Sequence, residues 1–507
     1  MSLRKLTVAA LWAATVAAAQ QPFDLDPNFR TTIQQQGIGS ILERPDGEII
    51  VSGSMYYPSQ FDLRGGILLT ADGAVNSTFP AYGYMGGKIV PWGADRFYAG
   101  NGQGIRRSWL DDGALDNNFN ALNQPLYSIF QGGDFHVFPD GRVLISGLDQ
   151  VRDSVRGFVG WYSLIWLNND GSLDTTRIHR QSEGPIVRFK ELPDGKFICN
   201  GSGGMVQGRN VSILFRVDSD GALDTTFNAP FLDYCYTYSY HPQSDGKVVC
   251  GGRYHFVGSP DTLSLIRLLP DGQLDPTFNN HLAFRSTYHH LATPSVLGIQ
   301  PIGPDKLAIT GSFDQIDGET RGGIAMVDTA GNLLDGYFNS NGCGAYEDGF
   351  QQYPYKFIVG ITPAMDGSYY IYGAYHGYDD GTTNDTSQRL ISRLYGLNVG
   401  IHEQEADQPQ PLQIAPNPSA GSTVFSAPAP LSNTELYIHD GSGRLVWQVE
   451  WPAGAEQYTL PAGALAPGAY VVRVAHAGTV LTCKCPVDLF STIFKPPKEV
   501  AAKHYPV

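Results

Sequence analysis

The stretch DGALDTTFN, residues 220–228, returns along the chain with small changes. Its other copies are DGAVNSTF from Asp72, DGALDNNFN from Asp112, DGSLDTTR from Asp170 and DGQLDPTFN from Asp271. Asp-Gly between apolar runs predicts a hairpin turn, because glycine accepts the positive φ of such turns and aspartate can bond its own backbone. Each copy therefore predicts a junction between two antiparallel strands.

A second phrase alternates with the first and has its own Asp-Gly turn. Its copies are PDGEIIVSG from Pro45, PDGRVLISG from Pro139, PDGKFICNG from Pro193, SDGKVVCGG from Ser244 and MDGSYYIYG from Met365, with the looser PDKLAITG from Pro304 and ADRFYAGNG from Ala94. The strands after these turns open at positions 48, 96, 142, 196, 247, 306 and 368, so the period is 46 to 62 residues. Two hairpins per period give four strands, the size of one propeller blade. The sequence predicts an all-β, seven-bladed β-propeller over residues 20–399.

The strand after the second turn carries three apolar residues in a row, as in Ile49-Ile50-Val51 and Phe197-Ile198-Cys199. A run without alternation predicts that both faces of this strand are covered, as in a blade between two blades. The run then meets a glycine such as Gly53 or Gly252, where the missing Cβ lets a neighbouring backbone approach.

The aspartate of the LDTTFN phrase has a structural interpretation. Asp224 is predicted to accept the backbone N–H of Thr226 or Phe227, and Phe227 to pack between blades. Because the residue recurs around the repeats, a catalytic or metal-binding role is disfavoured.

The two ends of the repeat region complement each other. The last unit has the strand RLISRLYGLN, residues 389–398, but no LDxxF phrase follows it. The missing piece, LDPNF, stands alone at Leu25–Phe29. Pairing of the two would close the ring with the N-terminal strand and leave no open edge.

Composition and the N-terminal sequence limit the possible binding partners and indicate the cellular location. Of the 507 residues only 16% are charged, and the formal net charge is -15 without a Lys/Arg-rich run, which disfavours nucleic acid and anionic membranes. Residues 1–19 have the basic start, apolar stretch and small terminal residues of a signal peptide. No other run is long enough for a membrane-spanning helix, so a soluble mature protein without a membrane span is expected.

The cysteines are too sparse for a disulfide framework. Cys199 and Cys250 occupy equivalent repeat positions, which favours small buried apolar side chains over a mutual bond. The pair Cys483 and Cys485 offers too few ligands for zinc.

A separate C-terminal part follows the repeats. Residues 400–412 are polar and proline-bearing, as in a linker, and residues 413–486 predict a small Ig-like β-sandwich that includes strands Glu435–His439 and Tyr470–Val474. Residues 487–507 form an atypical tail.

Two family resemblances rest on these motifs. The alternating phrases, over residues 23–398, resemble the delta-60 repeat family of exported bacterial proteins, which implies a β-propeller and no general activity. Pro416-Asn417-Pro418, Asp440-Gly441 with Gly443-Arg444, and Gly468-Ala469-Tyr470 resemble the type A C-terminal sorting domain of the type IX secretion system. That resemblance implies type IX machinery as a partner and a secreted or outer-surface location in a Gram-negative bacterium.

The sequence contains few recognisable catalytic or metal-binding motifs. The chain has no HExxH, no GxSxG and no complete phosphate loop, so no catalytic or metal-ligating residue is assigned. The acidic loops at residues 314–319 and 378–385 could hold calcium or could be ordinary solvated turns.

Aromatic and histidine side chains gather in the last three units. Tyr234, Tyr236, Tyr238 and Tyr240 have the spacing of one strand face. The candidate ligand-binding residues are Tyr288, His289, His290, Tyr346, Tyr353, Tyr375, His376 and Tyr378. Aromatic end loops suit a polysaccharide or another surface protein, and packing between blades is the structural alternative.

These observations leave three interpretations open. The leading one is a non-enzymatic surface protein whose propeller binds a glycan or a protein. The alternative is a polysaccharide lyase or hydrolase in which His289, His290 or His376 acts as base beside Asp379 or Glu347. The third is a spacer with no specific ligand.

Overall fold

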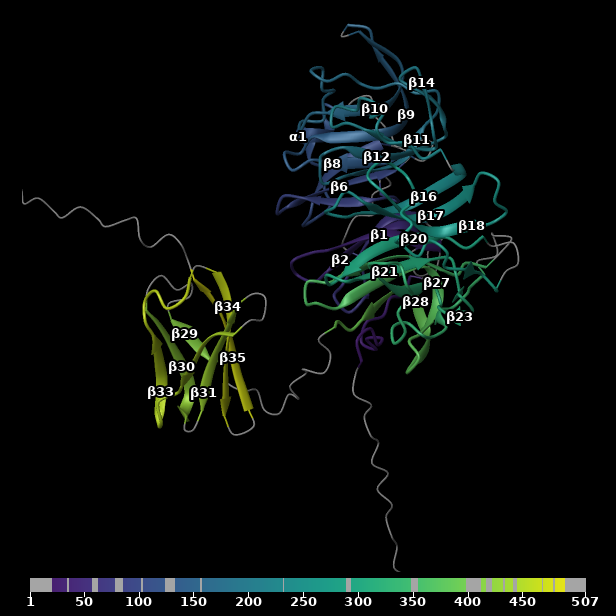
Figure 1. Cartoon of the computed structure of the whole chain (residues 1–507). Coiled ribbons are helices and arrows are strands. Elements are labelled where there is room, and N and C mark those ends of the chain that lie inside the picture. The colour runs from purple at the N-terminus through teal and green to yellow at the C-terminus, as the bar shows by residue number, and fades with distance from the viewer. Residues whose placement is uncertain are drawn as a thin grey trace, which may run out of the picture. The chain divides into compact units, whose positions relative to one another are not determined.

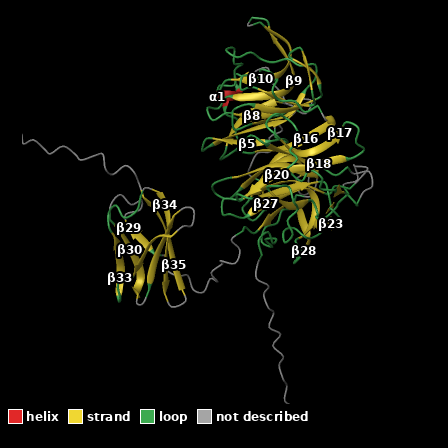
Figure 2. Cartoon of the chain, in the orientation of Figure 1, coloured by secondary structure: helices red, strands yellow, loops and turns green. Residues whose placement is uncertain are grey.

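The computed structural model describes residues 21–397 and 412–487, apart from gaps at 34–35, 57–62, 78–84, 102–103, 124–132, 156, 231, 289–292, 348–353, 416–421, 432–433, 441–444, 467 and 477–478. The chain divides into two compact units, Met1–Gly400 and Ile401–Val507. Strands make up almost all the regular structure of both, and the short helix α1 (Asn117–Asn120) is the exception within the described residues (Figures 1 and 2). The predicted signal peptide and most of the predicted linker and tail lie outside these residues.

The first unit is a series of antiparallel sheets, which we call the repeat sheets (Figure 1). Each is made from strands close together along the chain, in two cases with a small inserted hairpin between the second and third strands. Their strands are β1 (Gln36–Glu43), β2 (Ile49–Tyr56), β3 (Leu63–Leu69) and β4 (Val75–Asn76); β5 (Ile89–Trp92), β6 (Arg96–Asn101) and β7 (Gly104–Trp109); β8 (Phe135–Val137), β9 (Val143–Asp153) and β10 (Phe158–Leu167); β11 (Ile186–Glu191), β12 (Phe197–Gly201) and β15 (Leu214–Val217); β16 (Leu232–Pro242), β17 (Val248–Phe256) and β18 (Thr262–Leu268); β20 (Val296–Ile302), β21 (Lys306–Gly311) and β24 (Ile324–Asp328); and β26 (Phe357–Pro363), β27 (Tyr369–Asp379) and β28 (Asn384–Leu394), with β25 (Gly342–Cys343) beside β27.

The first unit also has two small additional sheets. One pairs β13 (Gly204–Val206) with β14 (Arg209–Val211), and the other contains β19 (Phe284–Arg285), β22 (Gln315–Ile316) and β23 (Glu319–Thr320). The repeat sheets are open, and none of those in the described chain closes on itself.

The hairpin interpretation of the second phrase is confirmed. Asp46, Asp194 and Asp245 each accept the backbone N–H two residues on, at 3.1 Å. The following glycines have positive φ, 83° at Gly47 and 80° at Gly195, which a side chain would strain. These turns join the first and second strands of the repeat sheets.

The first phrase forms less strand than predicted. In most sheets its fourth strand shrinks to a single β-bridge, such as Val217 with Leu223 or Leu268 with Leu274. In the bridge of Val217 with Leu223, the residue after Leu223 is Asp224, which accepts the N–H of Thr226 at 2.9 Å, as predicted. This bond turns the backbone away from the sheet and ends the strand.

The middle strand of each sheet is buried on both faces, as the apolar runs predict. Phe197, Ile198 and Cys199 are all buried, and they divide between two clusters. Phe197 and Cys199 pack with Trp166 of β10, whereas Ile198 packs with residues of β17. Neighbouring sheets therefore cover opposite faces of β12.

The free thiols agree with the burial interpretation. Cys199 and Cys250 are buried and unbonded, as are Cys235 and Cys343. The side chains of Cys483 and Cys485 lie outside the described residues.

The N-terminal segment pairs with the last repeat sheet. Leu25 bridges Leu394, Phe23 N–H donates to the Tyr395 carbonyl at 3.0 Å, and Asp26 N–H donates to the Arg393 carbonyl at 2.8 Å. The predicted pairing of LDPNF with the strand at 389–398 is thus confirmed at its first residues. The edge of β28 is covered by the start of the described chain.

The second unit has two antiparallel sheets around one core. One contains β29 (Gln413–Ala415), β30 (Thr423–Leu431) and β33 (Ala455–Leu460); the other contains β31 (Glu435–Asp440), β32 (Leu445–Glu450), β34 (Gly468–His476) and β35 (Thr479–Val487). Phe425 and Leu460 of the first sheet cluster with Leu436, Ile438 and Val472 of the second. The strands expected at 435–439 and 470–474 fall within β31 and β34.

Candidate functional site

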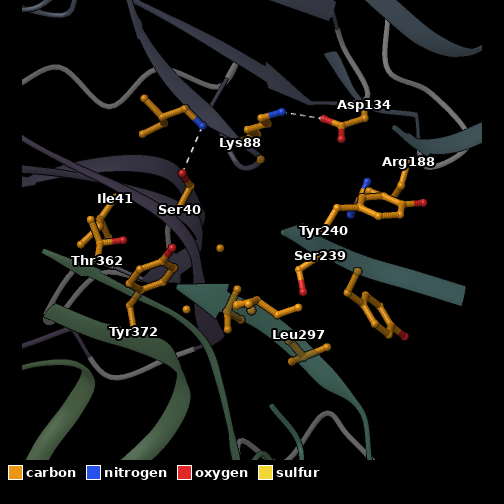
Figure 3. Close-up of a pocket in the computed structure, with 18 of the residues that line it drawn as sticks. Ser40, Ile41, Lys88, Asp134, Arg188, Ser239, Tyr240, Leu297, Thr362 and Tyr372 are labelled. Atoms are coloured by element: carbon orange, nitrogen blue, oxygen red, sulfur yellow. Dashed lines mark hydrogen bonds and ion pairs between the residues drawn. The ribbon is translucent and has the colours of Figure 1, made fainter. Parts of the chain in front are cut away.

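A cavity of about 1050 Å³ lies where the first strands of the repeat sheets meet. Its wall comes from β1, β11, β16, β20 and β26, from the residues just before β5 and β8, and from Tyr372 of β27 (Figure 3). A volume of this size matches small-molecule sites, which fall at roughly 300–1000 Å³.

Bulges in the first strands shape this wall. The register of the first hairpin shifts between Ile38 and Ser40, and the same shift occurs in β11, β16, β20 and β26. The repeat glycine stands opposite, since a Cβ on Gly53 would overlap the Gly37 carbonyl and lie 2.9 Å from Ile38 Cα. The glycine of the second phrase therefore admits the bulged backbone, and the bulge turns Gly39 toward the cavity.

Equivalent repeat positions line the cavity together as a ring, and five of them lie beside these bulges. Eight residues before each strand opening, at positions 40, 88, 134, 188, 239, 298 and 360, the chain has Ser, Lys, Asp, Arg, Ser, Gly and Gly. All seven line the cavity. The position six residues before each opening, two residues further along the same strand, holds Lys190, Gln300 and Thr362 among its lining members.

The charges lie on one side of this ring. Lys88 Nζ is 3.1 Å from Asp134 Oδ1 and donates to the Phe135 carbonyl at 2.8 Å (Figure 3). Arg188 Nη1 donates to the Val187 carbonyl at 3.2 Å. With Lys190, the described lining holds three cations and one carboxylate, a net formal charge of +2.

Two histidines stand beside the cations. Burial, followed by the nearby Lys88 and Lys190, lowers the pKa of His136 to about 4. Burial and then Lys190 also lower the pKa of His241. Both imidazoles are therefore neutral near pH 7, and the positive charge of the wall belongs to the lysines and the arginine.

The tyrosine stripe of β16 does not keep one face. A second register shift, between Thr237 and Ser239, interrupts the alternation on which the prediction depended. Tyr234 remains 54% exposed, whereas Tyr238 and Tyr240 both line the cavity, with Ser239 between them. At this bulge three consecutive residues, Tyr238 to Tyr240, line the cavity, whereas strict alternation would bring only every second residue to it.

The sequence-predicted ligand residues that the structure describes do not assemble into one surface. Tyr288 is half-buried; its N–H donates to Asp314 Oδ2 at 3.2 Å, and Lys356 Nζ lies 5.6 Å from its ring centre. His289, His290 and Tyr353 lie outside the described residues.

Two of the candidates do meet. The Tyr346 ring stacks on the His376 ring at 3.9 Å and on Tyr355 at 5.2 Å between centroids. Tyr346 is itself buried in the cluster that contains residues of β1 and β27. This arrangement is packing between neighbouring sheets.

Tyr375 and Tyr378 are core residues. They are 0% and 1% exposed, and Tyr375 shares a hydrogen bond with Ser392 at 2.9 Å. Their burial on strand β27 corrects the expectation that their ring faces are open to a ligand, because a buried ring cannot stack on a sugar.

The proposed acid–base partners have other contacts. Asp379 accepts hydrogen bonds from Gly381 N–H at 2.9 Å and from Asn341 Nδ2 at 2.8 Å. Glu347 is exposed. Of the three candidate histidines, His376 is the one among the described residues, and its ring stacks on Tyr346.

Carboxylates of the acidic loops bind the chain itself. Asp314 accepts the Thr287 and Tyr288 N–H groups, and Asp380 accepts those of Leu25, Thr382 and Thr383. Over the part of the chain that the structure describes, no group of three or more His, Cys, Asp or Glu side chains is placed to hold a metal ion.

Sequence reasoning missed Lys88, Asp134, Arg188 and Lys190. The signal was the repeat register: equivalent positions eight and six residues before each strand opening carry charged residues in some units and small or hydroxyl residues in others. Aligning the units at the second phrase would have found this ring.

Comparison with known families decides what the repeats and the second unit are. Residues 192–227 and 243–278 match the family described as Domain of unknown function (DUF5122) beta-propeller, and residues 413–487 match the Secretion system C-terminal sorting domain. The chain carries delta-60-like propeller repeats and a type IX sorting domain. The sorting domain implies secretion or an outer-surface location and interaction with the type IX machinery.

No curated protein matches the chain. Among solved structures, the extracellular domain of a putative hybrid two component system from B. thetaiotaomicron is 9% identical, with a TM-score of 0.40; the match covers 89% of this chain and 57% of that chain. A calcium-binding regucalcin from Agrobacterium tumefaciens is 15% identical, with a TM-score of 0.31 and coverage of 62% and 97%. This chain spans a little over half the length of the first of them.

No helix of the described chain has the length and apolar character to cross a membrane.

Proposed function

We propose that the protein is an exported, non-enzymatic surface protein that binds a polysaccharide in the central cavity of a seven-bladed propeller. The observation that carries the proposal is the cavity wall. Every repeat sheet contributes to it, through its first strand or through the residues just before that strand, and it combines cations, hydroxyls and tyrosines (Figure 3). Sugars are bound by such mixtures of aromatic faces and polar groups.

The order in which the sheets pack supports the seven-bladed ring. The first strands pack in sequence order, with β16 against β20, β20 against β26, and β26 against β1. Pairing of Leu25 with Leu394 supports closure by the N-terminal strand. The two sheets around one core support an Ig-like sandwich for the sorting domain.

A cavity-filling variant tests whether the cavity is the binding site. Gly39 lines the cavity, and an added Cβ there would have only the Ser52 carbonyl nearby, at 3.8 Å. We expect Gly39→Trp to abolish retention of the full exported protein on a polysaccharide panel in affinity electrophoresis. Gly39→Ala should be retained as the parent protein is.

Retention of Gly39→Trp at the parent level, with the fold intact by circular dichroism, would remove the cavity from the proposal. The same panel is assayed for new reducing ends and unsaturated products. Turnover would replace the proposal by the polysaccharide-processing enzyme, and no retention on any fraction would leave a spacer.

Deleting the sorting domain tests the export route. A chain that ends before residue 413 is expected to accumulate in the periplasm, because the matched domain at 413–487 is absent. Immunoblots of the periplasm, outer membrane and medium measure the distribution. Equal amounts of truncated and full-length protein at the surface would contradict the type IX route.

A further inference from the structure

We propose, resting on the polysaccharide-binding function above, that the cavity selects an acidic saccharide, a chain of uronic acid units, and that Lys190 binds its carboxylate. The proposal concerns one half of the cavity wall, where Lys88, Arg188 and Lys190 lie. In a protein of net charge -15, a cavity with a net positive wall concentrates anions against the field of the rest of the molecule.

The ring of equivalent positions makes the wall asymmetric. At the position eight residues before the strand opening, Lys88, Asp134 and Arg188 occupy three successive units, while Gly298 and Gly360 occupy the last two. The charged half therefore faces a half that lacks charge. This suits a ligand with an anionic group on one side and a neutral body on the other.

The cations differ in whether their charge is already paired within the protein. Lys88 is paired with Asp134 and with the Phe135 carbonyl. The Lys190 side chain is exposed and lines the cavity, and it has no hydrogen bond or ion pair with any described residue. It is the cation best placed to accept a new counter-ion.

The surroundings of Lys190 favour such a counter-ion. The cavity walls remove enough water from the exposed ammonium to lower its pKa, Lys88 lowers the pKa further, and Asp134 and Glu191 oppose the change. A bound carboxylate adds an opposite charge where water is depleted. Charge-assisted hydrogen bonds of this kind are about twice as strong as neutral ones.

The uncharged half of the wall fits the body of a sugar. Gln300 and Thr362 supply an amide and a hydroxyl, and Tyr238 and Tyr372 supply aromatic rings with hydroxyls. Thr362 and Tyr372 are labelled in Figure 3. A simple inorganic anion would use the cations alone and leave this wall without a partner. The combination therefore points to a carboxylated sugar.

The test is isothermal titration of the full exported protein with trimers of galacturonate, glucuronate and mannuronate. The neutral hexose trimers and a short poly-glutamate peptide are titrated alongside. We expect at least one uronate trimer to bind, the matching neutral trimer to bind at least about tenfold more weakly, and binding to weaken with salt.

Variants assign the effect to Lys190. Lys190→Met is expected to weaken uronate binding by at least about tenfold, and Lys190→Arg to retain most of it. Lys306→Met is the matched control, because this lysine pairs with Asp305 and does not line the cavity, yet its loss changes the net charge equally. Circular dichroism and thermal melts confirm that each variant folds.

Each other outcome is decisive. Equal affinity for neutral and acidic trimers, unchanged in Lys190→Met, overturns the acidic preference and leaves the polysaccharide function standing. Poly-glutamate binding more tightly than every uronate trimer overturns the saccharide assignment in favour of an acidic peptide. Binding of no saccharide, acidic or neutral, overturns both the inference and the proposed function.

Discussion

Replacing Asp224 with asparagine is expected to lower the free energy of unfolding by about 3 kcal/mol, the usual cost of leaving a buried ion without its partner. Asp224 is 5% exposed, and its Oδ2 accepts from both Arg216 Nε and Lys196 Nζ at 2.7 Å. The amide keeps an oxygen for Thr226 but turns an N–H group toward two cations. Urea denaturation of the folded protein measures the change.

The same ion pair links successive repeat sheets. Arg216 also donates to the Pro270 carbonyl at 2.6 Å, in the turn of the next sheet. Arg267 repeats the pattern, with Asp275 at 2.8 Å and the Thr329 carbonyl at 2.6 Å. The aspartate of the LDxxF phrase thus holds an arginine that clamps two sheets together.

Asp194→Asn is the matched control for Asp224→Asn. Asp194 is exposed and caps a hairpin turn through the Lys196 N–H at 3.1 Å, which an asparagine oxygen can also accept. We expect a change within about 0.5 kcal/mol. Similar losses in both variants would contradict the structural role assigned to the buried pair.

The pH dependence of stability should follow these carboxylates. Burial by itself would raise the pKa of Asp224, but hydrogen bonds from Lys196, Thr226 and Arg216 outweigh it and hold the pKa well below its usual range. Asp275 is held low in the same way. Because the folded-state pKa is depressed, the stabilisation is present above the unfolded-state pKa of about 4 and is lost as the pH falls below it.

Melting temperatures measured from about pH 6 to about pH 3 should therefore fall, and fall less steeply in Asp224→Asn than in the parent. Parallel curves for the two proteins would show that Asp224 does not contribute to acid sensitivity.

Replacing Gly53 with alanine is expected to destabilise the first repeat sheet by about 2 kcal/mol, in the range of overpacked cores. The new Cβ would overlap the Gly37 carbonyl and sit 2.9 Å from Ile38 Cα, so the bulged strand β1 must move away from β2. The overlap is with backbone, which cannot rotate aside. Chemical denaturation, with m-values compared, measures the loss.

Gly39→Ala is the control in the same hairpin. Its added Cβ would meet nothing nearer than the Ser52 carbonyl at 3.8 Å, an ordinary contact. We expect stability close to that of the parent. An equal loss at Gly39 would mean that the hairpin resists any side chain, and that close approach at Gly53 is not the cause.

Much of the repeat architecture could be predicted because its causes are local. The Asp-Gly turns, the buried run Phe197-Ile198-Cys199 and the cap at Asp224 each depend on residues a few positions apart. The candidate site could not be predicted from aromatic clustering, because burial decides whether a ring is available. Tyr375 is covered by neighbouring strands, while Tyr238 reaches the cavity through a bulge.

By itself the sequence determined the hairpins and their period, since turn chemistry and side-chain periodicity act over short distances, and it indicated the pairing of Leu25 with the last repeat strand through the repeat phrase that this strand lacks. Tertiary structure alone decided the partners of Asp224 and the grouping of Lys88, Arg188 and Lys190. Lys196 and Arg216 reach Asp224 from other parts of the same repeat sheet, and the three cations come from different repeat units that meet at the cavity. Both groupings exist only once strands far apart along the chain have paired and neighbouring sheets have packed.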